Sequence, residues 1–564
     1  EQLIQNVRIV GGGQTLRVDT GRDLQPGARY RLTVTGLSVN GEITGTEEIE
    51  FTTAPNRSTG TVTQRLSADA EDITDFRVTG LTPFSTAVDG SSLGQGSSNF
   101  PITNHNTLRV VFTQPVDENT VDYGPNGVQL QDADGNPVND VEVWTRGNRM
   151  TIDPEGVLKA GENYELRFSE KLKSALTQEP LAGDRTWEFT PQEARPVLDD
   201  GSIAKRAPLV QDAVDGSAGK VRYTGNDYNS VVLGATTLGQ GNKTIQRGTV
   251  TASLGDLQRF ESEGKAVPLT VERGTLMKGT SVDVLVGGEL QTEFRESGEI
   301  DVRFLSDANG YMMMNPYQDS DNAPRVIRLF ADLSMNTDKA KANGALSQEL
   351  LHVELVGTAQ IIDGKLTLEA VSVIQPDVLG VDKASGLISF RLEAYNDPED
   401  APAGLGDSSG PKLKAWTPGE NHQDKMQPQA PITLFFDEPL MPSTVNNQAV
   451  KLDSESQAGL PVNVRQNGPN IIVEPVDSLE FGESYTISFP GSIKDLSGQA
   501  ASLGALKFEM PKSAANAPVM PNDGKLPDAT GKGIQVGPRV LTSRPGYPCA
   551  KTELPENFQK SDAN

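Results

Sequence analysis

The chain has 564 residues and a net charge of −26, which repels the phosphate backbone of nucleic acid and excludes it as an expected partner. Gly (56) and Pro (36) are frequent and aromatic residues make up 5%, a composition typical of several small domains built from short strands and turns. No stretch approaches the ~18–20 apolar residues of a transmembrane segment, and the single cysteine, Cys549, excludes an intramolecular disulfide.

Residues 1–54 predict part of a small β-sandwich module. Alternating apolar residues predict strands around 7–9, 16–18, 30–34 and 49–51, and the pattern Leu24-x-x-Gly27-x-x-Tyr30 precedes the third of them. The strands that should begin such a module are absent, and half a sandwich would expose an unpaired edge. We therefore expect them upstream in a longer chain or donated by a neighbouring subunit. Residues 55–74 are polar and turn-rich and predict a linker.

A complete module is predicted at residues 75–192. Its entry strand lies at 76–78 and its core strand at 108–112, with a polar insertion at 89–106 between them. The corner pattern recurs as Leu158-x-x-Gly161-x-x-Tyr164, followed by an alternating strand and a closing strand that ends at Phe189. A tyrosine at such a corner can bury its ring while its hydroxyl bonds the backbone, so we expect Tyr164 to be structural.

Residues 193–408 alternate like strands but carry no copy of the corner. Strands are predicted around 269–271, 282–286, 300–304, 326–330, 353–355, 366–368 and 388–392, and short helices only near 254–260 and 339–351. We expect a larger antiparallel β-domain of unknown family, a sandwich or a jelly-roll-like pair of sheets.

A second complete module is predicted at residues 409–511. It repeats the corner as Leu479-x-x-Gly482-x-x-Tyr485 and closes at Phe508. Both complete modules also share a turn, since Phe112-Thr113-Gln114-Pro115 aligns with Phe436-Asp437-Glu438-Pro439. The tail, 512–564, is Pro-rich and predicts an extended segment. One strand, around 534–541, could complete the first module by strand addition in an assembly.

Together, the strand, F-x-x-P turn, D-x-x-G-N hairpin and L-x-x-G-x-x-Y corner resemble the bacterial Ig-like domains of surface proteins of the S-layer SbsA type. The resemblance covers residues 1–54, 75–192 and 409–511, as one partial and two complete copies. It implies an all-β chain of tandem Ig-like β-sandwiches flanking the central antiparallel β-domain, in an extracytoplasmic setting. It implies no catalytic residue.

The best metal candidate is the segment Asp132-Ala133-Asp134-Gly135-Asn136, where Asp132, Asp134 and Asn136 place oxygen ligands at alternate positions as a Ca²⁺ loop begins. The twelfth position of such a loop is Val143, which has no carboxylate, and the same residues also suit a plain hairpin turn. We expect no cofactor, with Ca²⁺ at this turn as the one alternative, and both interpretations of the turn stay open.

Other local patterns carry less chemistry. The three histidines, His105, His352 and His422, lack metal-ligand spacing, and Gly90-Ser91-Ser92-Leu93-Gly94 lacks the strand and helix that a nucleophile elbow needs. The Met-rich stretch 311–317 lies between two acidic loops. Its interpretation is either a packing strand or a partner-binding loop.

These observations predict a structural or scaffold protein of a bacterial cell surface, filament or envelope assembly, located outside the cytoplasm or associated with the outer membrane. Ig-like spacers would present the central domain, and the partners would be other protein subunits. The alternatives are an adhesin that binds a glycan or surface ligand and, less favoured, a hydrolase with Ig-like accessory domains, for which no pair of carboxylates could be assigned.

Overall fold

The computed structural model describes residues 4–10, 15–20, 29–52, 75–83, 100–194, 207–283, 297–337, 347–394 and 400–512, with short gaps inside several of these ranges. The described chain is almost entirely β, with one short α-helix, α1 (Leu257–Ser262). The expected all-β class is thus confirmed. No helix within these ranges is both long and apolar enough to cross a membrane.

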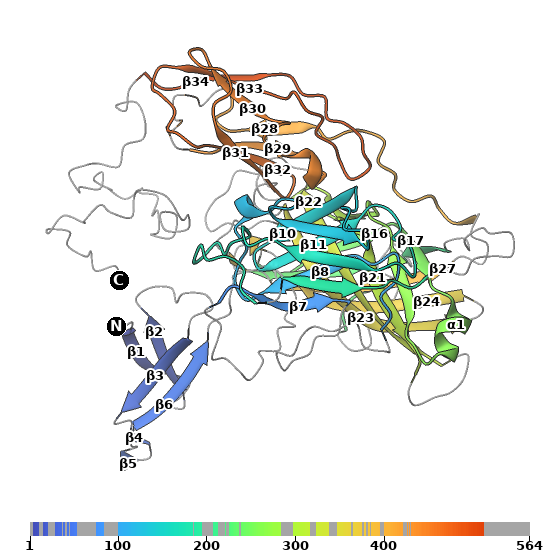
Figure 1. The fold of residues 1–564 in the computed structure, drawn as a ribbon. Helices are drawn as coiled ribbons and strands as arrows, with labels where there is room; N and C mark the ends of the chain where they lie inside the picture. The colour runs from blue at the N-terminus through green and yellow to red at the C-terminus, as the bar shows by residue number, and fades with distance from the viewer. Residues whose placement is uncertain are drawn as a thin grey trace.

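The N-terminal strands pair locally. β1 (Ile4–Val10) pairs with β2 (Thr15–Thr20), β3 (Arg29–Thr35) with β6 (Thr46–Thr52), and β4 (Ser38–Val39) with β5 (Glu42–Ile43). Figure 1 shows them in blue, to one side of the rest of the chain. Tyr30 lies opposite Phe51, as Tyr164 lies opposite Phe189 and Tyr485 opposite Phe508 in the two complete modules.

The first Ig-like module is a two-sheet sandwich. One sheet has the order β10-β11-β8-β7 and the other β13-β12-β9. The strands are β7 (Val78–Thr82), β8 (Leu108–Phe112), β9 (Val128–Asp132), β10 (Val141–Arg146), β11 (Arg149–Pro154), β12 (Tyr164–Phe168) and β13 (Thr186–Phe189). Alternate residues of both sheets, such as Leu108, Val110 and Phe112, are buried between them.

The second module repeats this arrangement with sheets β28-β29-β32-β31 and β30-β33-β34. The strands are β28 (Leu413–Trp416), β29 (Ile432–Phe436), β30 (Lys451–Ser454), β31 (Val462–Asn467), β32 (Asn470–Pro475), β33 (Ser484–Ser488) and β34 (Leu506–Glu509). A 3₁₀ turn follows the shared F-x-x-P turn in each module, η2 (Glu118–Thr120) in the first and η6 (Pro442–Thr444) in the second.

The tyrosine corners are confirmed in both complete modules. Tyr164 and Tyr485 are buried, and their hydroxyls accept hydrogen bonds from the backbone N–H of Lys159 (3.0 Å) and Glu480 (2.7 Å). The glycine of each corner has a positive φ, 81° at Gly161.

The central domain is one continuous twelve-stranded sheet, where we had expected a sandwich or a jelly-roll-like pair of sheets. Its shorter strands are β14 (Ala207–Gln211), β15 (Ser230–Ala235), β16 (Gly239–Arg247), β17 (Thr249–Leu254), β18 (Val267–Val271), β19 (Leu276–Gly279), β20 (Ile300–Phe304) and β21 (Ala308–Met313). Its four long strands are β22 (Arg325–Thr337), β23 (Gln348–Ile362), β24 (Lys365–Ile374) and β27 (Ser385–Ala394). A separate pair, β25 (Asp377–Val378) and β26 (Asp382–Lys383), connects two of them.

Two additional pairings, β22 with β23 and β14 with β27, close this sheet twice. Ring A runs β22-β20-β19-β16-β15-β27-β24-β23, and ring B runs β14-β17-β18-β21-β22-β23-β24-β27. Each ring therefore has its own short strands and shares the four long ones. The length of the shared strands allows each to belong to both rings. For example, β22 pairs with β21 of ring B over its first half and with β20 of ring A over its second half.

A β-bulge keeps the apolar face of β23 inward in both rings. The register between β22 and β23 shifts so that Leu351 and His352 of β23 oppose Asp332 alone. His352, in the bulge, has a φ of 58°. The extra residue shifts the alternation by one position, so the inward-facing residues are Leu350 before the bulge and Val353 and Leu355 after it. The bulge turns Asp332 and His352 outward, toward the first module.

Two local predictions in this domain need comment. The helix near 254–260 is confirmed as α1, which begins three residues later, at Leu257. The helix expected over 339–351 is wrong where the structure describes it, because 348–351 begin β23. The alternation of the central sheet outweighs local helix preference there.

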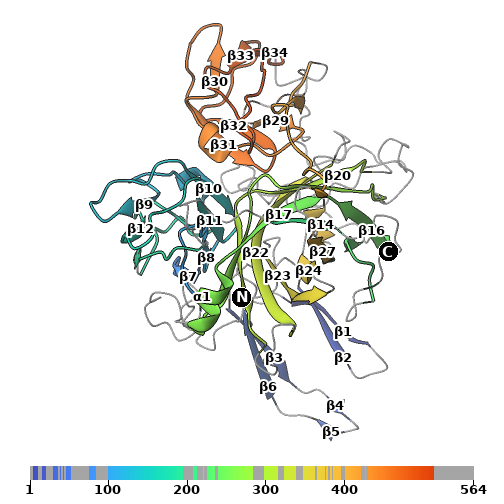
Figure 2. The ribbon, with the colours of Figure 1, turned by 90° about the vertical axis from the view of Figure 1, so that its right-hand side faces the viewer.

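The modules do not extend away from the central domain as stacked spacers, which corrects that part of our interpretation. The first module packs beside the central domain and the second beside both, as Figure 2 shows. Although about 300 residues apart in sequence, Glu142 of the first module and Ser443 of the second are hydrogen-bonded. The chain therefore folds back on itself.

Candidate functional site

The interior of each ring holds a small cavity. Ring B encloses about 30 Å³, lined by Ala252, Leu254, Leu269, Met312, Ile327, Leu366 and Leu368. Ring A encloses about 20 Å³, lined by eight apolar side chains together with Thr244 and Gln246. Each volume holds roughly one water- or methyl-sized group.

The two interiors differ in polarity. In ring A the hydroxyl of Thr244 and the carbonyl oxygen of Gln246 are buried without a hydrogen-bond partner, so this cavity suits a small polar guest such as water. In ring B every lining side chain is apolar. A ligand without hydrogen-bonding groups would lose nothing there, and flexible Met312 could move to admit it.

The first module is attached to the outer face of the rings by a buried charge pair. Arg109 of β8 lies 3.0 Å from Asp332 at the bulge, and the two side chains are 2% and 0% exposed. The guanidinium also donates to Ser306 Oγ and to the backbone carbonyl of Asp307. Asp332 in turn accepts from the backbone N–H of His352 at 2.7 Å. Because every member of this network is paired, the charges stay buried at tolerable cost.

His352 extends the same joint. Its Nε2 lies 3.1 Å from the carbonyl of Met150, and Arg149 donates to the carbonyl of Leu351 at 2.7 Å. Burial lowers the pKa of His352 to about 3, although the Asp332 carboxylate acts in the opposite direction. The imidazole is therefore neutral at physiological pH.

The second module meets the other two domains at a small apolar cluster, Trp144, Leu305, Leu351 and Leu496, to which all three domains contribute. Around it, Gln466 donates to Glu349 and Arg465 lies 3.2 Å from Glu118. Burial raises the pKa of Glu349 to about 7. On the opposite side, Arg303 of β20 reaches two acidic residues of the second module and its connecting segment, Glu438 and Asp407.

The predicted metal residues lie in the exposed turn between β9 and β10. Asp132 Oδ1 accepts from the backbone N–H of Asp134 (3.0 Å) and of Asn136 (2.8 Å), and the Asn136 amide donates to Oδ2 (3.2 Å). These hydrogen bonds lower the pKa of Asp132. The geometry explains the turn, and Ca²⁺ binding here stays a prediction.

The remaining candidates are resolved in part. The first three residues of the Met-rich stretch form the end of β21. There Met312 faces ring B, and the Tyr311 hydroxyl donates to the carbonyl of Pro101 in the first module. The start of the stretch is thus both a packing strand and a contact between domains, and residues 316–317 lie outside the described residues. His422, the 90–94 motif, the 534–541 segment and Cys549 lie outside the described residues.

Sequence reasoning missed the residues that join the domains. A signal was present, because Arg109 and Asp332 are single charges inside apolar strands, at Leu108-Arg109-Val110 and Ala331-Asp332-Leu333. A charge in such a position must find a buried partner. A single sequence does not show, however, that Arg109 and Asp332 would pair with each other.

Comparison with known proteins identifies the modules. Residues 72–191 and 407–509 match the bacterial Ig-like domain family. The chain is 31% identical over 583 aligned positions to alkane uptake protein B of Marinobacter nauticus, an alignment that covers 96% of this chain and 50% of that protein. The chain thus spans about half the length of this curated relative.

Two solved structures of the S-layer protein SbsC also align with the chain. They share 12% and 13% identity with it, over 79% and 78% of this chain and 56% and 54% of theirs. Their TM-score of 0.17 is too low to support an argument about the fold.

Proposed function

We propose, on the premise of its similarity to alkane uptake protein B, that this chain belongs to an extracytoplasmic, non-catalytic bacterial surface protein that helps to take up alkanes or similar hydrocarbons. The similarity covers nearly all of this chain and half of the relative. It supports a shared role for this half without specifying which step of uptake it performs.

The observation that carries the proposal to a site is the all-apolar interior of ring B. An alkane offers only apolar surface, so burial is the one force that can bind it. The cavity of about 30 Å³ is smaller than any liquid alkane. Binding would therefore require the side chains of Met312, Leu254 and their neighbours to move apart.

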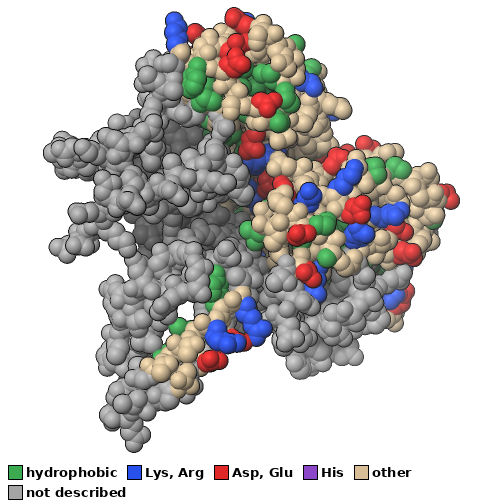
Figure 3. Space-filling view, turned by 60° about the vertical axis from the view of Figure 1, so that its left-hand side comes forward, with side chains coloured by type: hydrophobic (Ala, Val, Ile, Leu, Met, Phe, Trp, Pro, Cys, Tyr) green, Lys and Arg blue, Asp and Glu red, His purple; other side chains and the backbone are tan. Residues whose placement is uncertain are grey.

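In this proposal the Ig-like modules are scaffold. They contact the outer face of the rings through buried hydrogen-bond networks at Arg109 and Glu349. Other surface proteins would be the partners of this chain. On the face shown in Figure 3, acidic and basic side chains are mixed over the described surface. The described part of that face shows no patch of a single sign for a charged ligand.

The test is the binding of radiolabelled n-hexadecane to the purified chain. Leu368→Trp places an indole in the cavity of ring B. Ile374→Trp is the control, because it places an indole on the same face of β24 but in the cavity of ring A. We expect Leu368→Trp to weaken binding at least about tenfold and Ile374→Trp to leave it near wild type. Val373→Trp, on the exposed outer face of β24, controls for the added indole.

Circular dichroism melting of all three variants separates lost binding from lost folding, since overpacking also destabilises. No hexadecane binding by the wild-type chain, or equal loss in Leu368→Trp and Ile374→Trp, would refute the proposal.

A further inference from the structure

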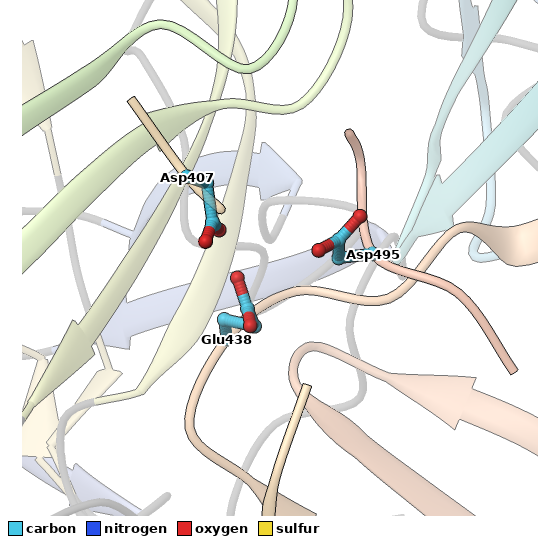
Figure 4. Close-up of side chains that lie close together, drawn as sticks. All are labelled: Asp407, Glu438 and Asp495. Atoms are coloured by element: carbon cyan, nitrogen blue, oxygen red, sulfur yellow. The ribbon is translucent and has the colours of Figure 1, made fainter. Parts of the chain in front are cut away.

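Three carboxylates converge where the second module meets the central domain (Figure 4). Asp407 comes from the segment that leads into the module, Glu438 from the F-x-x-P turn after β29, and Asp495 from the loop after β33. One oxygen of each lies within 4.8 Å of the others. Two oxygens bound to one Ca²⁺ ion at about 2.4 Å each are at most about 4.8 Å apart. Three oxygens at these separations share a point within about 2.8 Å of each, so small side-chain movements would bring one ion into contact with all three.

The positive charge beside the cluster is insufficient. Arg303 lies 2.7 Å from Asp407 and 3.2 Å from Glu438, so three carboxylates and this one guanidinium sum to −2 when all are ionised. Glu438 and Asp495 are 5% and 1% exposed.

Asp495 provides an independent indication of a missing ligand. Its Oδ1 accepts from the backbone N–H of Ser497 and of Gln499, both at 2.8 Å, which fixes the carboxylate. Its Oδ2 is buried and has no hydrogen-bond partner among the described residues. Figure 4 shows this carboxylate directed toward Asp407 and Glu438. An oxygen buried without a partner is costly unless something binds it.

The first module contains a neutral version of the same site. Its turn has Gln114 where the second has Glu438, and the bridge Val116–Ser174 matches the bridge Leu440–Asp495. There Ser174 Oγ donates to Gln114 Oε1 at 2.5 Å, so the pair satisfies itself. Two ionised carboxylates cannot do so. The fold therefore needs no acid at either position, and the second module carries acids at both.

We propose that Asp407, Glu438 and Asp495 bind one Ca²⁺ ion, which fixes the second Ig-like module to the segment that connects it to the central domain. Carboxylate oxygens are the ligands that Ca²⁺ prefers, and its flexible geometry leaves room for water or backbone carbonyls at the remaining positions. One divalent ion would balance the charge of −2. Because Asp407 comes from the connecting segment and Glu438 and Asp495 come from the module itself, the ion would fix the module to the segment that leads into it. This inference does not depend on hydrocarbon binding.

The test uses the full chain after removal of metal with EDTA. Calorimetric titration with CaCl₂ should show one site, with a Kd of about 10⁻⁴–10⁻³ M as in extracellular modules. Saturating Ca²⁺ should raise the Tm by roughly 3–5 °C. The decisive variant is Glu438→Gln with Asp495→Ser, which installs the pair already present in the first module. It should fold without Ca²⁺ and lose both the titration and the Tm shift.

Two further variants keep the test decisive. Asp495→Ser alone should weaken Ca²⁺ binding at least about tenfold even if the double variant folds poorly. Asp132→Asn, in the exposed hairpin turn, should leave the response intact. A wild-type chain with no titration, or a response lost in Asp132→Asn and kept in the double variant, would overturn the proposal.

Discussion

The guanidinium of Arg109 and the carboxylate of Asp332 lie 3.0 Å apart across the boundary between the first Ig-like module and the ring domain, and water reaches neither. Such a pair contributes little when intact, but removing one partner strands the other charge in the interior. The attachment of the module therefore depends on both residues being present.

Arg109→Met should lower the free energy of unfolding by about 3–5 kcal/mol, because Asp332 is left buried without its counter-charge. The measurement is urea denaturation followed by intrinsic fluorescence. Arg167→Met is the matched control, since Arg167 pairs with Glu165 on the exposed surface of the same module, where such pairs are worth at most about 1 kcal/mol. Equal losses in the two variants would contradict the interpretation.

Tyr485→Phe should destabilise the second module by about 1 kcal/mol, because it removes the hydroxyl that accepts from Glu480 N–H. Tyr164→Phe removes the equivalent bond from Lys159 N–H and should cost a similar amount in the first module. Thermal denaturation of both variants measures this. If neither Tm falls, the corner hydroxyls are dispensable and packing of the aromatic side chains alone stabilises the corner.

Acidification should destabilise the chain through His352. Because its folded pKa is about 3 and its ordinary value is 6.5, the unfolded state binds more protons between these limits. Its contribution is complete above pH 6.5 and is lost as the pH falls toward 3, by up to about 1.4 kcal/mol per pH unit.

His352→Asn separates this contribution from that of buried carboxyls such as Glu349, whose raised pKa acts in the opposite direction. Asn accepts the φ of 58° and does not titrate. The unfolding free energy of wild type, measured between pH 4 and 7, should rise more steeply with pH than that of the variant. Parallel curves would exclude His352 as the source.

Gly357→Ala should cost about 1–3 kcal/mol, because an added Cβ would lie 1.7 Å from the carbonyl oxygen of Glu369 on the neighbouring strand β24. Gly406→Ala, where nothing lies within 4 Å of an added Cβ, is the control. Both are compared by urea denaturation. A stable Gly357→Ala would mean that β23 and β24 separate more easily than their register implies.

The local elements could be predicted from sequence because their causes are local. Alternation predicts β18, β20, β24 and β27, and the Gly–Tyr spacing predicts the corners at Tyr164 and Tyr485. Closure of the sheet could not be predicted in this way. A period of two says which side chains point inward, but it is the same whether the strands form a sandwich or a ring.

The candidate Ca²⁺ site was missed for a related reason. Its three residues come from positions 407, 438 and 495, and no motif spacing connects them. The available signal was the difference between Gln114 and Glu438 at matched positions of two repeats. The best metal candidate from sequence was instead Asp132, Asp134 and Asn136, because ligand spacing can be recognised only among residues that lie close together in the chain.

The sharing of β22, β23, β24 and β27 by both rings has a mechanical consequence. These four strands form a wall common to both rings. A guest that displaces only side chains of ring B would leave ring A unchanged, whereas one large enough to displace the shared backbone would also deform ring A. The first module is attached to the same wall at the bulge beside Asp332, so its contact with the wall would resist that second kind of movement.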